Sequence, residues 1–357
     1  MMFLGGAQTT QNTDKMATDI QSTRNFGLDN LKALLSIVII ILHVTVPYTN
    51  VSIPWYFEPE LPNETLPINP IITFARNCGM PIFFMISGFF VPISYDKQGF
   101  NTFLWKKTKR LLIPAFTVWA ICINITPYPM YHVWFLQWLF LFCLLYALFR
   151  LITKWRIEEG KKLELTIVIL VGLFLIMCFF TLIIRQKYYI NQFIIVFKIF
   201  SFEPAKMAQN FFAFYFGILA RRFDWFTPKS KKLVIEIIAV IIVTFIIREI
   251  RITEENYIGS RLDAILETSY SLFQSLLVIW IFNKFINKSN RFVQSIAENS
   301  FGIYLFHLPI LYFVQTYTKM CEFYFPLKLV LIILFAAATS YLISYLLRKI
   351  KFIRNFI

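Results

Sequence analysis

The stretch LKALLSIVIIILHVTVPYTN, residues 31–50, decides the fold class. A helix needs about 20 mostly apolar residues to cross a bilayer, and this stretch supplies them with one Lys near its start and one His further on. Nine later segments have a similar length and character. The ten predicted spans are residues 31–50, 68–91, 111–127, 132–150, 164–184, 205–220, 233–250, 267–285, 299–318 and 327–347. The sequence therefore predicts an all-α integral membrane protein built as a bundle of about ten transmembrane helices.

Composition supports this prediction and excludes other classes of protein. Hydrophobic residues make up 58% of the 357 residues and charged residues only 15%, whereas soluble domains have about 45–50% and about 25%. The mean hydropathy is +0.62, which excludes a disordered chain. The net charge of +15 comes from basic residues that punctuate the apolar runs, so it does not indicate a nucleic-acid partner. The five cysteines have no metal-binding spacing, and no metal is expected.

The basic residues predict how the bundle is oriented. Alternate loops and the two ends of the chain, including a basic loop at 97–110, hold 25 of the 35 Lys and Arg residues. The positive-inside rule then places both termini in the cytoplasm. We expect a polar, flexible tail at 1–28, a transmembrane domain at 29–348 and a basic cytoplasmic tail at 349–357. The composition fits a multi-pass protein of a bacterial plasma membrane.

One stretch between two predicted spans is apolar but falls short of a span. Residues 188–202 are too short and too polar to cross the bilayer. We expect them to form a helix that lies at the membrane interface.

All three histidines of the chain, His43, His132 and His307, fall in or at the edge of predicted spans. Polar groups there are costly, so each one is a candidate for function. Lys32 precedes His43 by eleven residues, or about 16–17 Å along a helix. This pair suits a substrate with an anionic head at Lys32 and a reactive end at His43. The alternative is a Lys that reaches toward the headgroups and a structural His.

The second predicted span carries two further features. Arg76 lies at its outer end, where it either faces lipid headgroups or binds a substrate hydroxyl, carboxylate or phosphate. Ser87 and Gly88 are small residues, which allow neighbouring helices to approach closely. Packing is therefore the favoured interpretation for this pair.

Two more groups of residues lie at the ends of spans. Lys109 and Arg110 precede the third span on the cytoplasmic side, either as an anchor for anionic lipid or as ligands of phosphate groups. Trp134 follows His132 at the outer end of the fourth span. Aromatic residues commonly form a belt at the interface, but the His beside them is unusual and indicates a substrate site.

The order of five motifs resembles a known family. They are LDNLK at 28–32 with His43 following, PIFFMISGFF at 81–90, KRLLIP at 109–114, HVWFL at 132–136 and FGIYLFHLP at 301–309. From about residue 24 to 347 the chain resembles the acyltransferase-3 family of integral membrane acyltransferases, of the O-acetyltransferase type. In that family the first span carries an Arg, ten residues, then an essential His. Lys32 occupies the Arg position here, so the positive charge is kept but the forked geometry of Arg is lost.

The resemblance implies a substrate and a reaction. The donor would be acyl-CoA, with acetyl-CoA as the first choice, bound from the cytoplasm by Lys32, Lys109 and Arg110. The acceptor would be a hydroxyl of a sugar, polysaccharide or lipid-linked saccharide, bound near Arg76 and the outer aromatic residues. Some members carry a fused esterase-like domain that this chain lacks, so it would act alone or with a separate protein partner.

His43 is the candidate catalytic residue. A neutral imidazole can accept the proton of the attacking hydroxyl as a general base, and a covalent acyl-imidazole is the second possibility. The sequence offers no carboxylate that could orient His43. A transporter or flippase for a small acid or a lipid-linked saccharide is the main alternative function.

Overall fold

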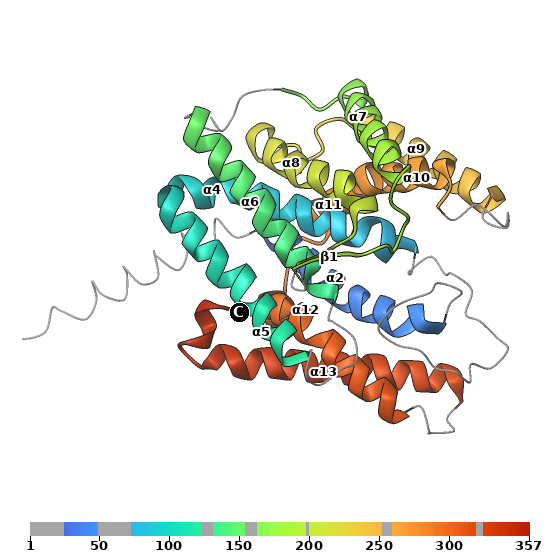
Figure 1. Cartoon of the computed structure of the whole chain (residues 1–357). Helices are drawn as coiled ribbons and strands as arrows, with labels where there is room; N and C mark the ends of the chain where they lie inside the picture. Colours follow the sequence, from blue (N-terminus) through green and yellow to red (C-terminus); the bar gives the residue numbers. More distant parts are fainter. Residues whose placement is uncertain are drawn as a thin grey trace, which may run out of the picture.

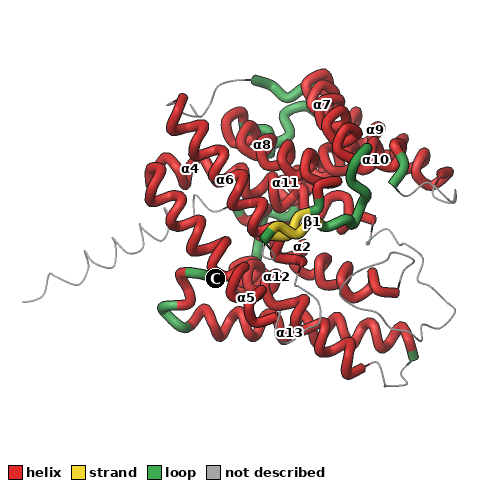
Figure 2. The backbone as a smooth tube through the Cα atoms, viewed as in Figure 1, coloured by secondary structure: helices red, strands yellow, loops and turns green. Residues whose placement is uncertain are grey.

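The computed structural model describes residues 25–48, 73–122, 131–153, 163–197, 200–251, 259–318 and 324–357. These residues are almost entirely helical, as the composition predicts (Figure 1, Figure 2). Each of the ten predicted spans overlaps one or more of the observed helices. In chain order the helices are α2 (Phe26–Thr45), α4 (Met80–Lys107), α5 (Ile113–Cys122), α6 (Trp134–Thr153), α7 (Ile167–Arg185), α8 (Met207–Phe223), α9 (Lys231–Arg251), α10 (Arg261–Ser269), α11 (Ser275–Phe285), α12 (Arg291–Thr318) and α13 (Phe325–Lys349).

Six stretches of the described chain are long and apolar enough to cross a membrane. They are Phe26–Tyr48, Ala75–Cys122, Trp134–Thr153, Ile167–Arg185, Arg261–Phe285 and Phe325–Lys349. Large apolar side chains on α7, α9 and α13 point outward, among them Val168, Ile235 and Leu334. Since water would not tolerate so much exposed apolar surface, these faces are suited to contact with lipid. The protein is an integral membrane protein, and whether α8, α9 and α12 also cross the bilayer stays a prediction.

The basic stretch 97–110 is helical, so the loop predicted there is wrong. Helix α4 continues to Lys107 and leads through a π-helical turn, Thr108–Leu112, into α5. Gly99 has a φ of 70° and kinks α4 at this point. Only glycine adopts this backbone conformation at little cost, so the chain changes direction at Gly99 between two helical segments.

The predicted interfacial helix at 188–202 is also wrong. Strands β1 (Ile194–Val196) and β2 (Phe200–Phe202) pair in an antiparallel hairpin between α7 and α8. The hairpin is fixed to α6, because the amide of Ser201 donates to Gln137 Oε1 over 3.0 Å. The rings of Trp138 and Phe202 also meet edge to face. β-branched residues at its start favour a strand over a helix.

Helix α2 is held at both ends, which fixes the position of His43. Near its start, the side-chain amide of Asn30 donates to the carbonyl oxygens of Ile286 and Lys288, over 2.6 and 2.8 Å. Near its end, Gln315 on α12 donates to the carbonyl of Val44 over 3.3 Å. In Figure 1, α12 and α13 run side by side next to α2. These buried polar contacts define the register of α2 against its neighbours.

Candidate active site

The three histidines, which lie far apart in the sequence, meet in the structure. The rings of His43 on α2 and His307 on α12 have centroids 4.9 Å apart. The ring of His132, in the short turn Tyr131–Val133 before α6, lies 5.4 Å from that of His307. His132 and His307 are buried and His43 is half-buried. The ring of His307 therefore contacts both of the other rings.

Backbone carbonyls fix the orientation of all three rings. Nδ1 of His43 lies 2.8 Å from the carbonyl oxygen of Ile39, one turn earlier on α2. Nδ1 of His307 lies 2.6 Å from the Tyr304 carbonyl oxygen, and Nε2 of His132 lies 3.2 Å from that of Leu305.

The tautomers follow from these contacts. A carbonyl oxygen can only accept, so each of these ring nitrogens carries a proton. In the neutral ring the other nitrogen is then the basic one, which is Nε2 in His43. The orienting group that the sequence did not reveal is therefore a peptide carbonyl of the same helix.

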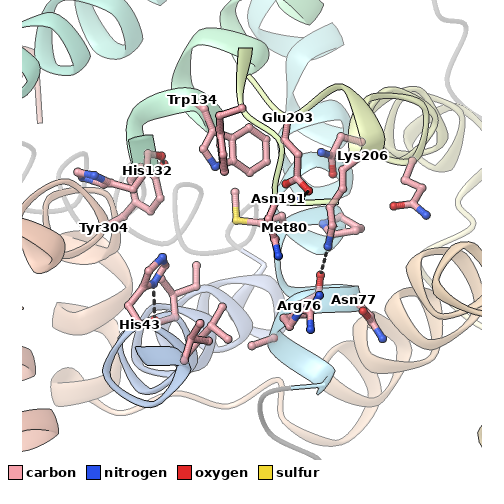
Figure 3. A pocket seen from close by; sticks show the side chains of 18 residues that line it. His43, Arg76, Asn77, Met80, His132, Trp134, Asn191, Glu203, Lys206 and Tyr304 are labelled. Atoms are coloured by element: carbon pink, nitrogen blue, oxygen red, sulfur yellow. Dashed lines mark hydrogen bonds between the residues drawn. The ribbon is translucent and has the colours of Figure 1, made fainter. Parts of the chain in front are cut away.

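A pocket opens beside this cluster (Figure 3). Its lining includes four residues that the sequence singles out, His43, Arg76, His132 and Trp134. His307 is not part of the lining but packs directly behind His43. The pocket thus collects residues from the end of α2 and the starts of α4 and α6, which the predicted orientation places on one side of the membrane.

The opposite wall of the pocket carries charged residues that the sequence reasoning missed. Nζ of Lys206 lies 2.6 Å from Glu267 Oε1 and donates to the Arg76 carbonyl oxygen over 3.2 Å. Glu267 also forms an ion pair with Arg185 at the end of α7. Lys206, Glu267 and Arg185 fall at or just beyond the ends of predicted spans. Charged residues are costly at such positions, so their charge could have marked them as candidates for function.

The hairpin segment completes this wall. Asn191, Phe193 and Glu203 line the pocket from the connection between α7 and α8. The backbone amide of Asn191 donates to Glu203 Oε1 over 2.8 Å, and Asn191 adopts a φ of 62°. Asn tolerates this left-handed conformation better than most residues. The predicted interfacial segment therefore forms part of the site.

The three cations predicted to bind the donor do not line the pocket. Lys32 forms an ion pair with Asp29, with 2.7 Å between Nζ and Oδ1. It lies about 16 Å from His43 along the axis of α2. Lys109 Nζ lies over the ring of Trp105, 4.9 Å from its centroid. Arg110 lies close enough to Arg348, near the end of α13, for the two positive charges to repel each other.

The motifs and the site match one protein family. A family model described as an acyltransferase domain matches residues 25–126 and 123–349, which is most of the chain. The chain belongs to this family of membrane acyltransferases. The match includes all three histidines of the site and both ends of helix α2. No curated protein matches the chain closely.

The geometry of the acyltransferase pocket is suited to proton transfer. It contains an oriented imidazole, His43, beside two further rings whose second nitrogens, His132 Nδ1 and His307 Nε2, have no hydrogen-bond partner among the described residues. In the same part of the chain no three His, Cys, Asp or Glu side chains are placed to hold a metal ion. The site therefore offers a base, amide groups and paired charges around one cavity.

Proposed function

We propose that the protein transfers an acyl group, acetyl in the first instance, from acyl-CoA to a hydroxyl of a sugar, polysaccharide or lipid-linked saccharide. The acyltransferase family supports the group transfer. The observation that carries the proposal is the placement of His43 in the pocket lining, with Nδ1 directed at the Ile39 carbonyl. That contact leaves Nε2 as the basic nitrogen of the neutral ring.

His43 acts as the general base in the proposed reaction. Its Nε2 takes the proton from the acceptor hydroxyl as the oxygen attacks the thioester carbonyl. A carbon–oxygen bond forms, the carbon–sulfur bond breaks, and the proton passes from His43 to the departing thiolate of coenzyme A. The acyl group ends on the acceptor, and His43 returns to its neutral form.

The donor is proposed to reach His43 from the cytoplasmic side. The predicted orientation places the start of α2, with Lys32, on that side and His43 beyond the midplane. Lys32 would hold an anionic group of coenzyme A while the thin acyl-bearing arm extends along α2. Lys109 and Arg110 are the further candidates, and Arg348 adds a nearby positive charge that favours phosphate.

The acceptor is proposed to occupy the outer part of the pocket. The indole of Trp134 provides an apolar face for a sugar ring, and Glu203, Gln209 and Asn210 provide hydrogen-bonding groups for hydroxyls. Small polar ligands are typically oriented by a few such groups in a mostly apolar pocket. His132 lines the wall beside His43, and His307 packs against both rings from behind.

Replacing His43 tests the proposal. We expect His43→Ala to insert and fold, because loss of the polar ring makes α2 more apolar. Acyl transfer should fall by at least about 100-fold, the low end of the contribution of a positioned general base. His43→Gln should be equally inactive, since an amide accepts a hydrogen bond but not the proton. Release of free coenzyme A by the purified protein is the measurement.

Two controls make this experiment specific. Leu34 lies on the exposed face of the same helix, so Leu34→Ala should leave turnover unchanged. A transporter or flippase would release no coenzyme A in any variant. Normal turnover in His43→Ala together with loss of activity in His307→Ala would move the base to α12 and contradict the assignment.

A further inference from the structure

Three cations of the helical bundle with largely buried side chains, Arg150, Arg185 and Lys206, are paired with carboxylates. Nη2 of Arg150 on α6 lies 2.5 Å from Asp96 Oδ1. Arg185 and Lys206 share the buried carboxylate of Glu267. Pairing is expected, because an unpaired charge in this environment is expensive. A cation without such a partner therefore calls for a physical reason.

Arg76 is the exception in the pocket. Its side chain is half-buried and lines the cavity (Figure 3). None of the hydrogen bonds or ion pairs of the described residues involves its guanidinium, which has five N–H donors. Two carboxylates lie in the region. Arg76 and Asp263 attract each other through their opposite charges, but no ion pair joins them among the described residues. Glu203 accepts from the amide of Asn191, and Asp263 lies 4.0 Å from Arg185 Nη1.

The backbone of Arg76 is nevertheless held firmly in place. It lies in a π-helical turn, Ala75–Gly79, that leads into α4. Its carbonyl oxygen accepts from Lys206, whose ammonium is in turn fixed by Glu267. Irregular turns of this kind occur frequently at functional sites. The paired cations thus support the turn, while the guanidinium itself remains available to the cavity.

We propose that Arg76 binds an acid group of the substrate, a carboxylate. This inference rests on the proposed transfer function and narrows its substrates to those that carry a negative charge near the reacting centre. Guanidinium groups bind such anions by two parallel charge-assisted hydrogen bonds. The acid group belongs either to the acyl chain, as in a dicarboxylic acyl donor, or to the acceptor, as in a sugar acid.

Binding measurements with matched pairs of probes test the inference and identify the source. Full-length protein carrying His43→Ala, in lipid nanodiscs, is titrated with succinyl-CoA and acetyl-CoA, and separately with glucuronate and glucose. This background binds without turnover, so the result does not depend on whether transfer is observed. Each pair differs chiefly by one acid group, on the acyl chain or on the sugar. The member without that group is called the neutral probe, since the phosphates of coenzyme A are common to succinyl-CoA and acetyl-CoA.

We expect one acid-bearing probe to bind more tightly than its neutral counterpart. Adding Arg76→Gln should weaken its binding by about tenfold or more, as expected for loss of a charge-assisted hydrogen bond. Binding of the neutral probe should not change. Arg76→Lys should restore part of the difference, because it keeps the charge without the fork. An effect on the succinyl pair assigns the acid group to the acyl chain, and an effect on the glucuronate pair assigns it to the acceptor.

Arg261→Gln is the matched control, since it removes the same charge from an exposed position at the start of α10. It should leave all four affinities unchanged. The proposal is overturned if acid-bearing and neutral probes behave alike, absence of binding included. It is equally overturned if Arg76→Gln weakens both members of a pair to the same extent, which would indicate a general structural role.

Discussion

Helices α4 and α8 pack closely where they cross, and the segments at their starts line the pocket. The two regions use different chemistry. At their crossing, a Cβ atom added to Gly88 would collide with the backbone carbonyl of Phe214, and one added to Gly217 would collide with that of Met85. At their starts, the segments instead contribute Arg76 and Lys206 to the pocket. The crossing contains backbone in direct contact, whereas the pocket contains charged groups around a cavity.

The difference shows how a membrane protein separates stability from function. Lipid is as apolar as a helix surface, so helices gain little from apolar contact alone and associate through close packing and buried polar pairs. The crossing uses close packing. The pocket uses polar groups, and these are needed only where a substrate binds or reacts. The two regions should therefore respond differently to substitution.

Glu267 is expected to give the largest effect, because its carboxylate supports the pocket wall through Lys206 and also pairs with Arg185. Its carboxylate is buried and pairs with Arg185 and Lys206. Glu267→Ala would leave both cations without their shared partner, which costs about 3–5 kcal/mol of stability. Thermal unfolding of the purified protein measures the loss. Glu249→Ala is the matched control, since the Glu249 carboxylate is exposed and its pair with Arg248 should contribute at most about 1 kcal/mol. Equal effects of the two variants would show that the buried network is not structural.

Gly88 gives a smaller effect that is confined to the crossing. Gly88→Ala places a methyl group against the Phe214 backbone, which must shift, at a cost of about 1–3 kcal/mol. Gly172→Ala on α7 is the control, because a Cβ there meets nothing within 4 Å. Thermal unfolding should separate the two variants. The folded fraction of Gly88→Ala should retain normal coenzyme A release, and a large loss of turnover per folded molecule would show that crossing and pocket are coupled.

Much of the fold could be predicted from hydrophobic runs. Each predicted span overlaps a helix, and the close approach expected at Gly88 is confirmed by its contact with Phe214. The predictions failed outside the apolar runs. Residues 97–110 are rich in charge, so a loop was predicted there. Apart from the kink at Gly99 they are helical, and the stretch ends in the π turn. Residues 188–202 have no clear period, and pairing between β1 and β2 decides their structure.

The site was predictable only on the side of the histidines. His43 and His307 stand out because they interrupt apolar runs, but their contact depends on how α2 and α12 pack. The opposite wall depends on pairings between distant residues, such as Lys206 with Glu267. Spacing along one chain does not reveal such pairs. Lys206 and Glu267 are next to apolar runs in the sequence, so they were interpreted only as the ends of predicted spans.

The smallest effect is expected at Lys32, which lies at the end of α2 that is far from the pocket. If Lys32 holds a phosphate of the donor, Lys32→Ala should raise the KM for acetyl-CoA by about tenfold, the low end for a charge-assisted contact. The low end applies because Lys32 is partly exposed and already paired with Asp29. Stability should hardly change, and kcat should be retained because His43 is untouched. Initial rates of coenzyme A release at several donor concentrations provide both constants.

Two further variants decide what an effect at Lys32 means. Lys32→Arg keeps the charge and should keep the KM, whereas Lys229→Ala removes a largely exposed cation elsewhere and should change nothing. An unchanged KM in Lys32→Ala would move the donor head to Lys109 and Arg110. The start of α2 would then bind no part of the donor, and the functional region of this helix would be confined to the pocket around His43. A raised KM extends that region along the whole helix, because binding energy at one end would then position the reacting group at the other.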